Sequence, residues 1–279
     1  MKRWKNTLRL TALHMILIVL CLITLLPIYY TFTVSINASN SILSTEIQLF
    51  PRDLTLENYQ KLLLEKPFFL WLKNTLLLSV CTVVLTLAVA VPAAYAFSRF
   101  RFRGRGAALS VLVILNAFPA ILSMFAIYRI MKLMGLVNTY PGLIIIYIGT
   151  MAVFSLWNMK GYFDSIPADI EDAARIDGAN DRQLIWRIVL PLARPSIIVT
   201  AVLVLIYVWN EYIFTTIFLS GSEKYTLAVG LYSLQATDYT RNWPLFSAAS
   251  ILTSLPVLAI FFAIQRYMVS GLTAGSVKG

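Results

Sequence analysis

The sequence has few of the residues from which metal centres and disulfide frameworks are built. Its 279 residues include one histidine, His14, and two cysteines, Cys21 and Cys81. Both cysteines lie inside long apolar runs, which is not the spaced pattern of a small disulfide-bonded domain. One imidazole and two buried thiols also leave no set of ligands for a zinc cluster. The sequence therefore predicts neither a disulfide framework nor a metal site.

Charged residues are scarce as well, and apolar residues are abundant. Only 13% of the chain is charged and 59% is hydrophobic, which is too apolar for a soluble domain of this length. A membrane-spanning helix needs about 20 apolar residues, and the sequence has several apolar runs of this length. The strands of a membrane barrel would instead alternate between apolar and polar residues, and these runs do not alternate. The sequence therefore predicts an all-α integral membrane protein. Its six predicted spans are Leu10–Val34, Trp71–Phe97, Ala107–Tyr128, Pro141–Met159, Ser196–Leu219 and Phe246–Met268.

The basic residues are distributed unequally between the two sides of the predicted membrane domain. Fifteen of the 23 lysines and arginines fall on the side that carries both termini, the Arg99–Arg105 turn and the loop 164–194. Because basic loops stay in the cytoplasm, we expect this side to be cytoplasmic. The first apolar run is too long for a signal peptide, so we expect it to be a retained helix. Anionic lipids account for the net charge of +10 without nucleic acid.

The loop 164–194 is the longest polar segment between predicted spans, and its pattern predicts two short helices. Pro167 suits the first turn of a helix, and Gly178 suits its end. Asn180 followed by Gln183 predicts a capping box at the start of a second helix, which we expect to stop at Pro191. An apolar stripe on that helix comprises Leu184, Ile185 and Ile188. The loop is therefore predicted to be an ordered helix–turn–helix.

The spacing inside this loop resembles the coupling-loop motif of ATP-binding-cassette importer permeases. That motif reads E-A-A, three residues, G, nine residues and then I-x-L-P. The residues at matching places are Ala173, Ala174, Gly178, Ile188, Leu190 and Pro191. Asp172 stands where the family usually has Glu, which is a conservative departure. The resemblance implies the type I importer permease fold, with a loop that docks on a cytoplasmic ATPase.

The resemblance also implies which residues carry the coupling. We expect Ala174 and Gly178, four residues apart, to form a small-residue surface that another protein can approach closely. The alternative is a helix pair that lies on the membrane surface. The predicted ATPase-coupling residues are Glu171, Asp172, Ala173, Ala174, Asp177, Gly178, Ile188, Leu190 and Pro191.

The segments Gly135–Leu143 and Ser270–Gly279 resemble sugar permeases of the maltose/maltodextrin type. This implies the shorter of two permease subunits in a bacterial plasma-membrane importer. The implied partners are a homologous longer permease, two ATP-binding-cassette ATPase subunits, an extracytoplasmic sugar-binding protein and membrane lipids, with no nucleic acid. The implied organisation is a cytoplasmic N-terminus (1–9), a six-helix permease domain (10–269) and a cytoplasmic tail (270–279).

The sequence contains no Walker A motif, G-x-x-x-x-G-K-[ST], so we expect a subunit that is not itself an ATPase. We therefore expect no cofactor on this chain, with ATP and Mg on the partner ATPase subunits.

A few polar groups fall within the predicted spans. Glu211 is the only acidic residue inside any of them, and a carboxylate there is costly unless it is paired or wet. We expect it to line the pathway or an interface; the alternative is contact with water at the membrane boundary. Pro119 should kink its span. The candidate residues for the substrate pathway or an interface are Asn116, Pro119, Trp209, Asn210, Glu211 and Tyr212.

Three other functions remain as alternatives from the residues. One is a permease of the same superfamily for another solute, such as an amino acid, a phosphonate or a polyamine. A second is an intramembrane enzyme, which would need paired carboxylates, a metal cluster or a Ser/His or Ser/Lys arrangement. A third is a passive channel, which would not need an ordered helix pair in the loop.

Overall fold

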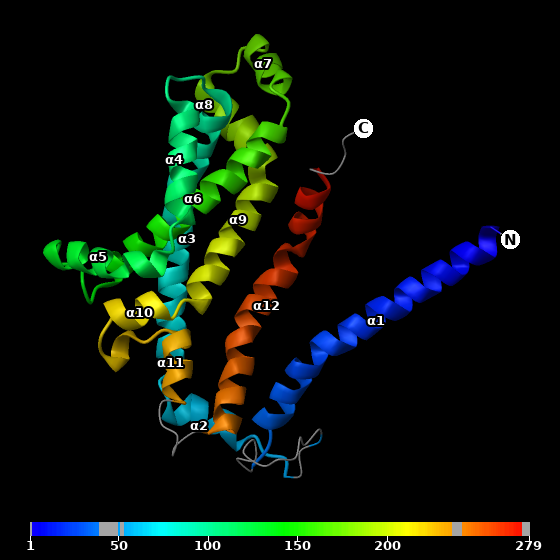
Figure 1. The fold of residues 1–279 in the computed structure, drawn as a ribbon, viewed down its shortest axis with the longest axis vertical. Coiled ribbons are helices and arrows are strands. Elements are labelled where there is room, and N and C mark those ends of the chain that lie inside the picture. Colours follow the sequence, from blue (N-terminus) through cyan, green and yellow to red (C-terminus); the bar gives the residue numbers. More distant parts are fainter. Residues whose placement is uncertain (1, 39–49, 51–52, 236–241, 275–279) are drawn as a thin grey trace. The chain divides into compact units, whose positions relative to one another are not determined.

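The computed structural model describes residues 2–38, 50, 53–235 and 242–274 of the chain (Figure 1). Among these residues the secondary structure is helical, apart from one isolated β-bridge between Asn37 and Leu54. The chain divides into two compact units. We call residues 1–69 with 230–256 the α1 unit, and residues 70–229 with 257–279 the α6 unit.

The α1 unit contains α1 (Lys2–Ser35), α2 (Glu57–Glu65) and the first part of α12 (Trp243–Ala274). The amide of Asn58 on α2 donates to the carbonyls of Ser35 and Asn37, each at 3.0 Å. The hydroxyls of Tyr59 and Ser35 are 2.7 Å apart. Because Asn58 is buried, these bonds fasten α2 to the end of α1. From Leu10 to Ile28 the apolar side chains of α1 are exposed on all sides, as in a helix that faces lipid.

The α6 unit is centred on α6 (Tyr140–Ser165) and α9 (Leu190–Asn210), which run side by side (Figure 1). Asn158 of α6 donates to the hydroxyl of Thr200 on α9 at 2.7 Å. Around this pair lie α3 (Phe68–Arg99), α4 (Arg105–Ala117), α5 (Ala120–Leu133), α7 (Asp169–Ile176), α8 (Asp181–Gln183), α10 (Ile213–Phe218) and the start of α11 (Leu227–Ser233).

Two hydrophobic clusters occupy the interior of the α6 unit, and α6 contributes to both. The first, which we call the α10 core, includes Tyr147, Val208, Phe214 and Phe218. The second, the α7 core, comprises Ala94, Leu156, Met159, Phe163, Ala174, Leu184, Val189 and Ala193. We call the end of the unit that carries residues 99–105 and 164–194 the loop end.

Five helices in the described residues are long and apolar enough to cross a membrane, and α4 with α5 makes a sixth if the two are one broken span. The predicted third span, Ala107–Tyr128, is interrupted at the proline that was expected to kink it. The helix stops at Ala117 and α5 starts at Ala120, turned by 101° (Figure 1). Pro119 has no N–H to continue α4, and it holds Phe118 in an extended conformation, so the expected kink is a complete break.

The predicted fifth span, Ser196–Leu219, was wrong at both ends. Its helix starts at Asp181, passes through a π-helical segment, η2 (Leu184–Val189), and stops at Asn210. Pro191 therefore does not end the second loop helix as we expected. It lies in the first turn of α9, directly after η2, and the wider π turn relieves the clash of its ring with the preceding turn. At the other end of the chain, α12 continues to Ala274, past the expected tail boundary at 270.

Candidate functional site

The loop end forms the ordered helix–turn–helix that the sequence predicts. Gly178 follows α7 with φ +86°, a left-handed conformation that glycine adopts without strain. The Asn180 side chain accepts from the backbone N–H of Gln183 at 2.9 Å, and the Gln183 side chain accepts from that of Asn180 at 3.0 Å. The predicted capping box is thereby confirmed. Gly178 ends the first helix and the capping box starts the second, so the turn between them has a fixed conformation and the loop presents a defined surface.

Glu171 points into the chain rather than outward. It is 5% exposed, and its carboxylate pairs with the Nε of Arg99 at 2.6 Å and accepts from the hydroxyl of Tyr95 at 2.8 Å. Arg99 also donates from Nη2 to the carbonyl of Ile166 at 2.9 Å. The first acidic residue of the predicted coupling set therefore joins α7 to the end of α3.

Ala174 is also turned inward, where it packs in the α7 core with Leu184. The expected small-residue surface of Ala174 and Gly178 was therefore wrong, because only Gly178 is exposed. A Cβ added at Gly178 would meet nothing within 4 Å, so this glycine is required by its backbone and not by close packing within the chain.

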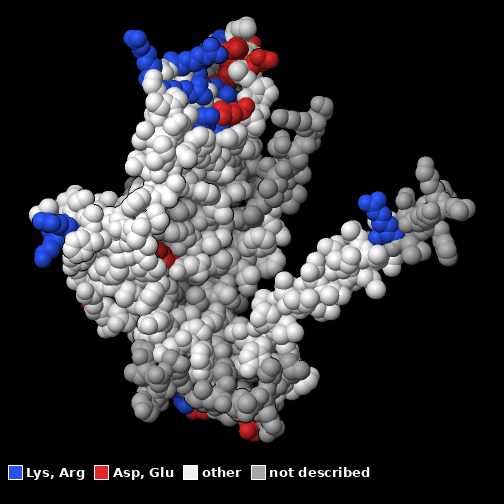
Figure 2. All heavy atoms as spheres, in the orientation of Figure 1, with Lys and Arg blue, Asp and Glu red and all other residues white. Residues whose placement is uncertain are grey.

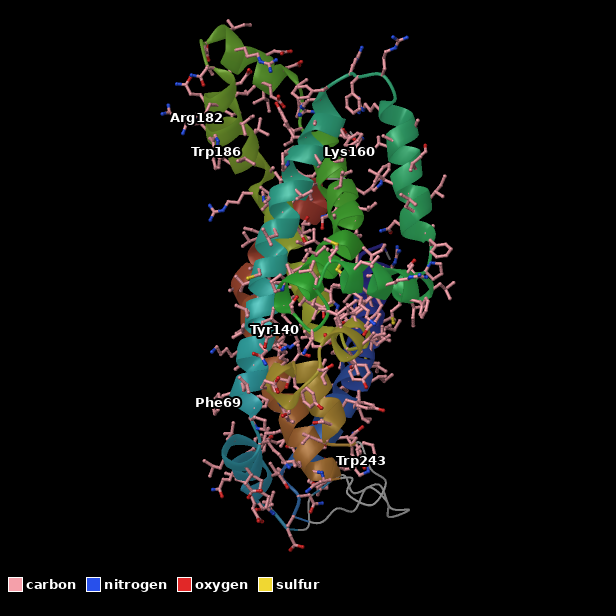
Figure 3. The ribbon with its side chains drawn as sticks, turned by 90° about the vertical axis from the view of Figure 1, so that its left-hand side faces the viewer. Phe69, Tyr140, Lys160, Arg182, Trp186 and Trp243 are labelled. Carbon is pink, nitrogen blue, oxygen red and sulfur yellow. The ribbon has the colours of Figure 1, made fainter. Side chains whose placement is uncertain are left out.

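The exposed face of the loop carries two large apolar side chains that sequence reasoning missed. Ile176 is 87% exposed and Trp186 is 67% exposed. In Figure 3, Arg182 and Trp186 project from the α8–η2 segment away from the neighbouring helices. The sequence held a sign of this exposure for Trp186, because this residue falls outside the apolar stripe of Leu184, Ile185 and Ile188. Exposed apolar groups of this kind are candidates for contact with another protein or with the membrane surface.

Charged side chains share the loop end with these two residues. Figure 2 shows blue lysine and arginine atoms gathered over the loop end, with red acidic atoms on α7 beside them. Arg175 lies 4.0 Å from Asp172 and 3.8 Å from Asp181, in exposed pairs that stabilise the loop little. The other predicted coupling residues on this surface are Asp172, Ala173, Asp177 and Pro191, which are exposed, while Ile188 and Leu190 are half-buried.

Glu211 lies between helices and not inside one. It is the C-cap of α9, with extended backbone, and its carboxylate caps the start of α10. It accepts from the backbone N–H of Phe214 at 2.7 Å and of Thr215 at 3.0 Å, and from the hydroxyls of Tyr147 at 2.7 Å and Thr215 at 2.9 Å. Glu211 is buried by its own chain, with 8% of the residue exposed. Four donors satisfy the charge internally, an arrangement that neither sequence interpretation anticipated.

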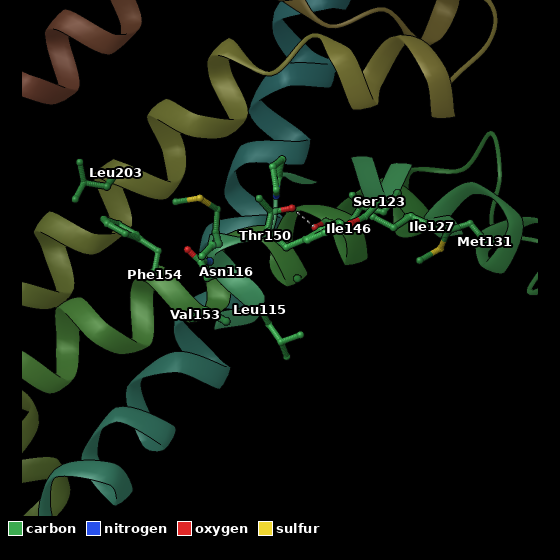
Figure 4. A pocket seen from close by; sticks show the side chains of 15 residues that line it. Leu115, Asn116, Ser123, Ile127, Met131, Ile146, Thr150, Val153, Phe154 and Leu203 are labelled. Carbon is green, nitrogen blue, oxygen red and sulfur yellow. Dashed lines mark hydrogen bonds between the residues drawn. The ribbon is translucent and has the colours of Figure 1, made fainter. Parts of the chain in front are cut away.

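The candidate pathway residues fall into two separate places. Asn116 and Pro119 line an open hollow of about 810 Å³ among α4, α5 and α6, with Ser123 and Thr150 as further polar lining (Figure 4). None of the residues Trp209–Tyr212 lines it. Trp209 is buried, Tyr212 is half-buried, and Asn210 is exposed with its amide bonded to the carbonyl of Ile206. In the part of the chain that the structure describes, no group of three or more His, Cys, Asp or Glu could hold a metal.

Comparison with known proteins identifies relatives along the whole chain. The model of the family described as binding-protein-dependent transport system inner membrane component matches residues 83–273. The chain is 34% identical to the galactooligosaccharides transport system permease protein GanQ of Bacillus subtilis (strain 168), over 99% of this chain and 98% of that protein. It is 35% identical to the maltodextrin transport system permease protein MdxG of the same strain, over 95% of each.

Solved structures show the same architecture. A chain from the crystal structure of a bacterial ABC transporter involved in the import of the acidic polysaccharide alginate superposes with a TM-score of 0.79 at 29% identity, over 95% of this chain and 98% of that one. The predicted all-α permease fold is thereby confirmed. The chain belongs to the family of binding-protein-dependent transport system inner membrane components and has the type I fold of ABC importer permeases.

Proposed function

We propose that this chain is the shorter permease subunit of an ATP-driven oligosaccharide importer, with a maltodextrin-like sugar as the leading candidate. The observation that carries the proposal is the near-complete alignment, at 34% and 35% identity, with permease proteins named for galactooligosaccharides and maltodextrin. The alginate importer, whose chain superposes on this one, supports the same class of solute.

The proposed complex contains a longer homologous permease, two ATPase subunits and an extracytoplasmic sugar-binding protein. The chain itself binds no cofactor in this proposal, and ATP with Mg is bound by the ATPase subunits. Ile176 and Trp186 support a docking role for the loop end, because exposed apolar side chains on an ordered loop gain stability when a partner covers them.

The proposed orientation places the loop end and both termini in the cytoplasm. Arg99, Arg101, Arg103 and Arg105 lie within one short turn at that end, and this density of positive charge favours the cytoplasmic side. The α10 end then faces the binding protein.

The proposed mechanism uses two parts of the α6 unit. ATP closes the ATPase dimer, the docked loop moves with it, and the rigid α6–α9 pair carries that motion across the membrane. The hollow of about 810 Å³ supports a place for sugar beside this pair, since Asn116, Ser123 and Thr150 offer hydrogen-bonding groups in an apolar lining.

The docking role is tested with Ile176→Ser in the complete complex of both permeases and the ATPase subunits. The variant should lower the ATPase recovered with the tagged permease pair and lower sugar-stimulated uptake in proteoliposomes. The matched control is Leu64→Ser, because Leu64 on α2 is also an exposed aliphatic residue, at 84% against 87%. Wild-type recovery and uptake for Ile176→Ser would refute docking through this face. Uptake assays with oligosaccharides, amino acids, phosphonates and polyamines identify the solute class.

A further inference from the structure

A chain of polar contacts connects three helices at the loop end. Lys160 and Asp164 of α6 form an ion pair at 2.5 Å, and the hydroxyl of Ser98 on α3 donates to Asp164 at 2.6 Å. Arg99 contacts Ser98 at 3.3 Å and pairs with Glu171 of α7 at 2.6 Å. The contacts therefore run without interruption from α6 through α3 to α7.

The Arg99–Glu171 pair is the buried part of this chain. The two side chains are 15% and 6% exposed, whereas those of the two ion pairs that Arg175 makes, with Asp172 and with Asp181, are 49% to 88% exposed. A buried pair with further hydrogen bonds holds one geometry, while exposed pairs exchange freely with water. The hydroxyl of Tyr95 and the carbonyl of Ile166 supply those further bonds.

The connections of α7 along the chain are not helical. Ile166 before it is extended, and Gly178 after it is left-handed, so neither side continues the helix. Within α7 only Glu171 and Ala174 are buried. The buried side chains that fix the orientation of α7 are therefore Glu171, with its ion pair to Arg99 and its hydrogen bond from Tyr95, and Ala174 in the α7 core.

We propose that Glu171, held by Arg99 and Tyr95, is a positioning residue that makes α7 move as one body with α3. The inference rests on the proposed docking of the loop on the ATPase subunits. It adds that the motion of these subunits passes from α7 to the membrane-spanning helix α3. Glu171 faces α3 and not the docking surface, so it transmits the motion without touching the ATPase. The chemical requirement is opposite charge at residues 99 and 171.

The test measures the distance between spin labels at Arg103→Cys and Asp169→Cys in the complete complex, with Cys21 and Cys81 replaced by serine. Both labelled positions are exposed. In the parent complex, one narrow distance distribution should persist with and without ATP. In Glu171→Gln the distribution should broaden, and sugar imported per ATP hydrolysed should fall about tenfold, within the usual range of coupling between sites. ATPase recovery with the permease should stay at the parent level.

The exchanged variant Arg99→Glu with Glu171→Arg separates positioning from a general need for these residues. It restores opposite charges and should recover most of the coupling ratio and the narrow distribution, whereas Arg99→Glu alone should not. Glu57→Gln is the matched control, because it breaks the exposed Lys61–Glu57 pair on α2 and should change neither readout. A narrow distribution and full coupling in Glu171→Gln would overturn the proposal. Failure of the parent complex to retain ATPase would instead overturn the proposed function.

Discussion

The hydroxyl of Tyr147 on α6 donates a 2.7 Å hydrogen bond to the carboxylate of Glu211, which lies 64 residues further along the chain between α9 and α10. Two backbone N–H groups at the start of α10 complete the binding of the same carboxylate. A negative charge at a helix N-terminus is stabilised by those N–H groups. This explains how an acidic side chain is buried among apolar helices.

Glu211→Gln should destabilise the permease pair by about 1–3 kcal/mol. The amide keeps the size but places its own N–H donors against the N–H and O–H donors that now face the carboxylate. Thermal unfolding of the purified pair in detergent measures the change. The control is Glu223→Gln, because Glu223 is exposed. An unfolding temperature equal to that of the control would show that the carboxylate does not hold α10 in place.

Tyr147→Phe should cost less than Glu211→Gln, on the order of 1 kcal/mol, because it removes one of four donors. The two losses should not add, since both variants remove the same hydrogen bond. A double-mutant cycle on unfolding of the pair measures this. Tyr128→Phe serves as a control, because Tyr128 packs against the same core, with its ring centroid 5.5 Å from that of Phe218. Fully additive losses would mean that Tyr147 and Glu211 act independently.

Gly178→Val should impair ATPase binding or coupled uptake while leaving membrane insertion unchanged. Valine strains a backbone with φ +86° and adds bulk to the docking surface. Gly135→Val is a matched control, because Gly135 also has positive φ, at +70°, and open space around it, but lies in a turn outside the loop end. Recovery of ATPase with the tagged permease pair, ATP hydrolysis and sugar uptake are measured together. If Gly178→Val and Gly135→Val reduced ATPase recovery and uptake equally, backbone strain alone would explain the loss, and a role of Gly178 in docking would be refuted.

A membrane-impermeant maleimide should label Ser222→Cys in intact cells and Arg103→Cys only after permeabilisation, in a background without Cys21 and Cys81. The expectation follows from the basic turn at residues 99–105, which favours the cytoplasm, while residue 222 lies between α10 and α11. The reverse labelling pattern would place the loop end outside and exclude a cytoplasmic ATPase as its partner.

Much of the architecture follows from short stretches of sequence. Uniform apolar runs predict the spans, because length and hydropathy are sufficient to cross a bilayer. The capping box of Asn180 and Gln183 depends on neighbours within one helical turn, so the sequence alone predicts it. The family spacing from Asp172 to Pro191 likewise needs no tertiary information.

The direction in which a side chain points was decided only by the tertiary structure. Spans that are apolar on every side carry no periodic stripe, so their rotation cannot be read from the residues. The inward turn of Ala174, the pairing of Glu171 with Arg99 and the capping role of Glu211 each depend on that rotation or on contacts between distant segments. The sequence therefore supplies the helices and the loop, and packing between helices decides which polar groups hold the protein together and which ones are left to meet a partner.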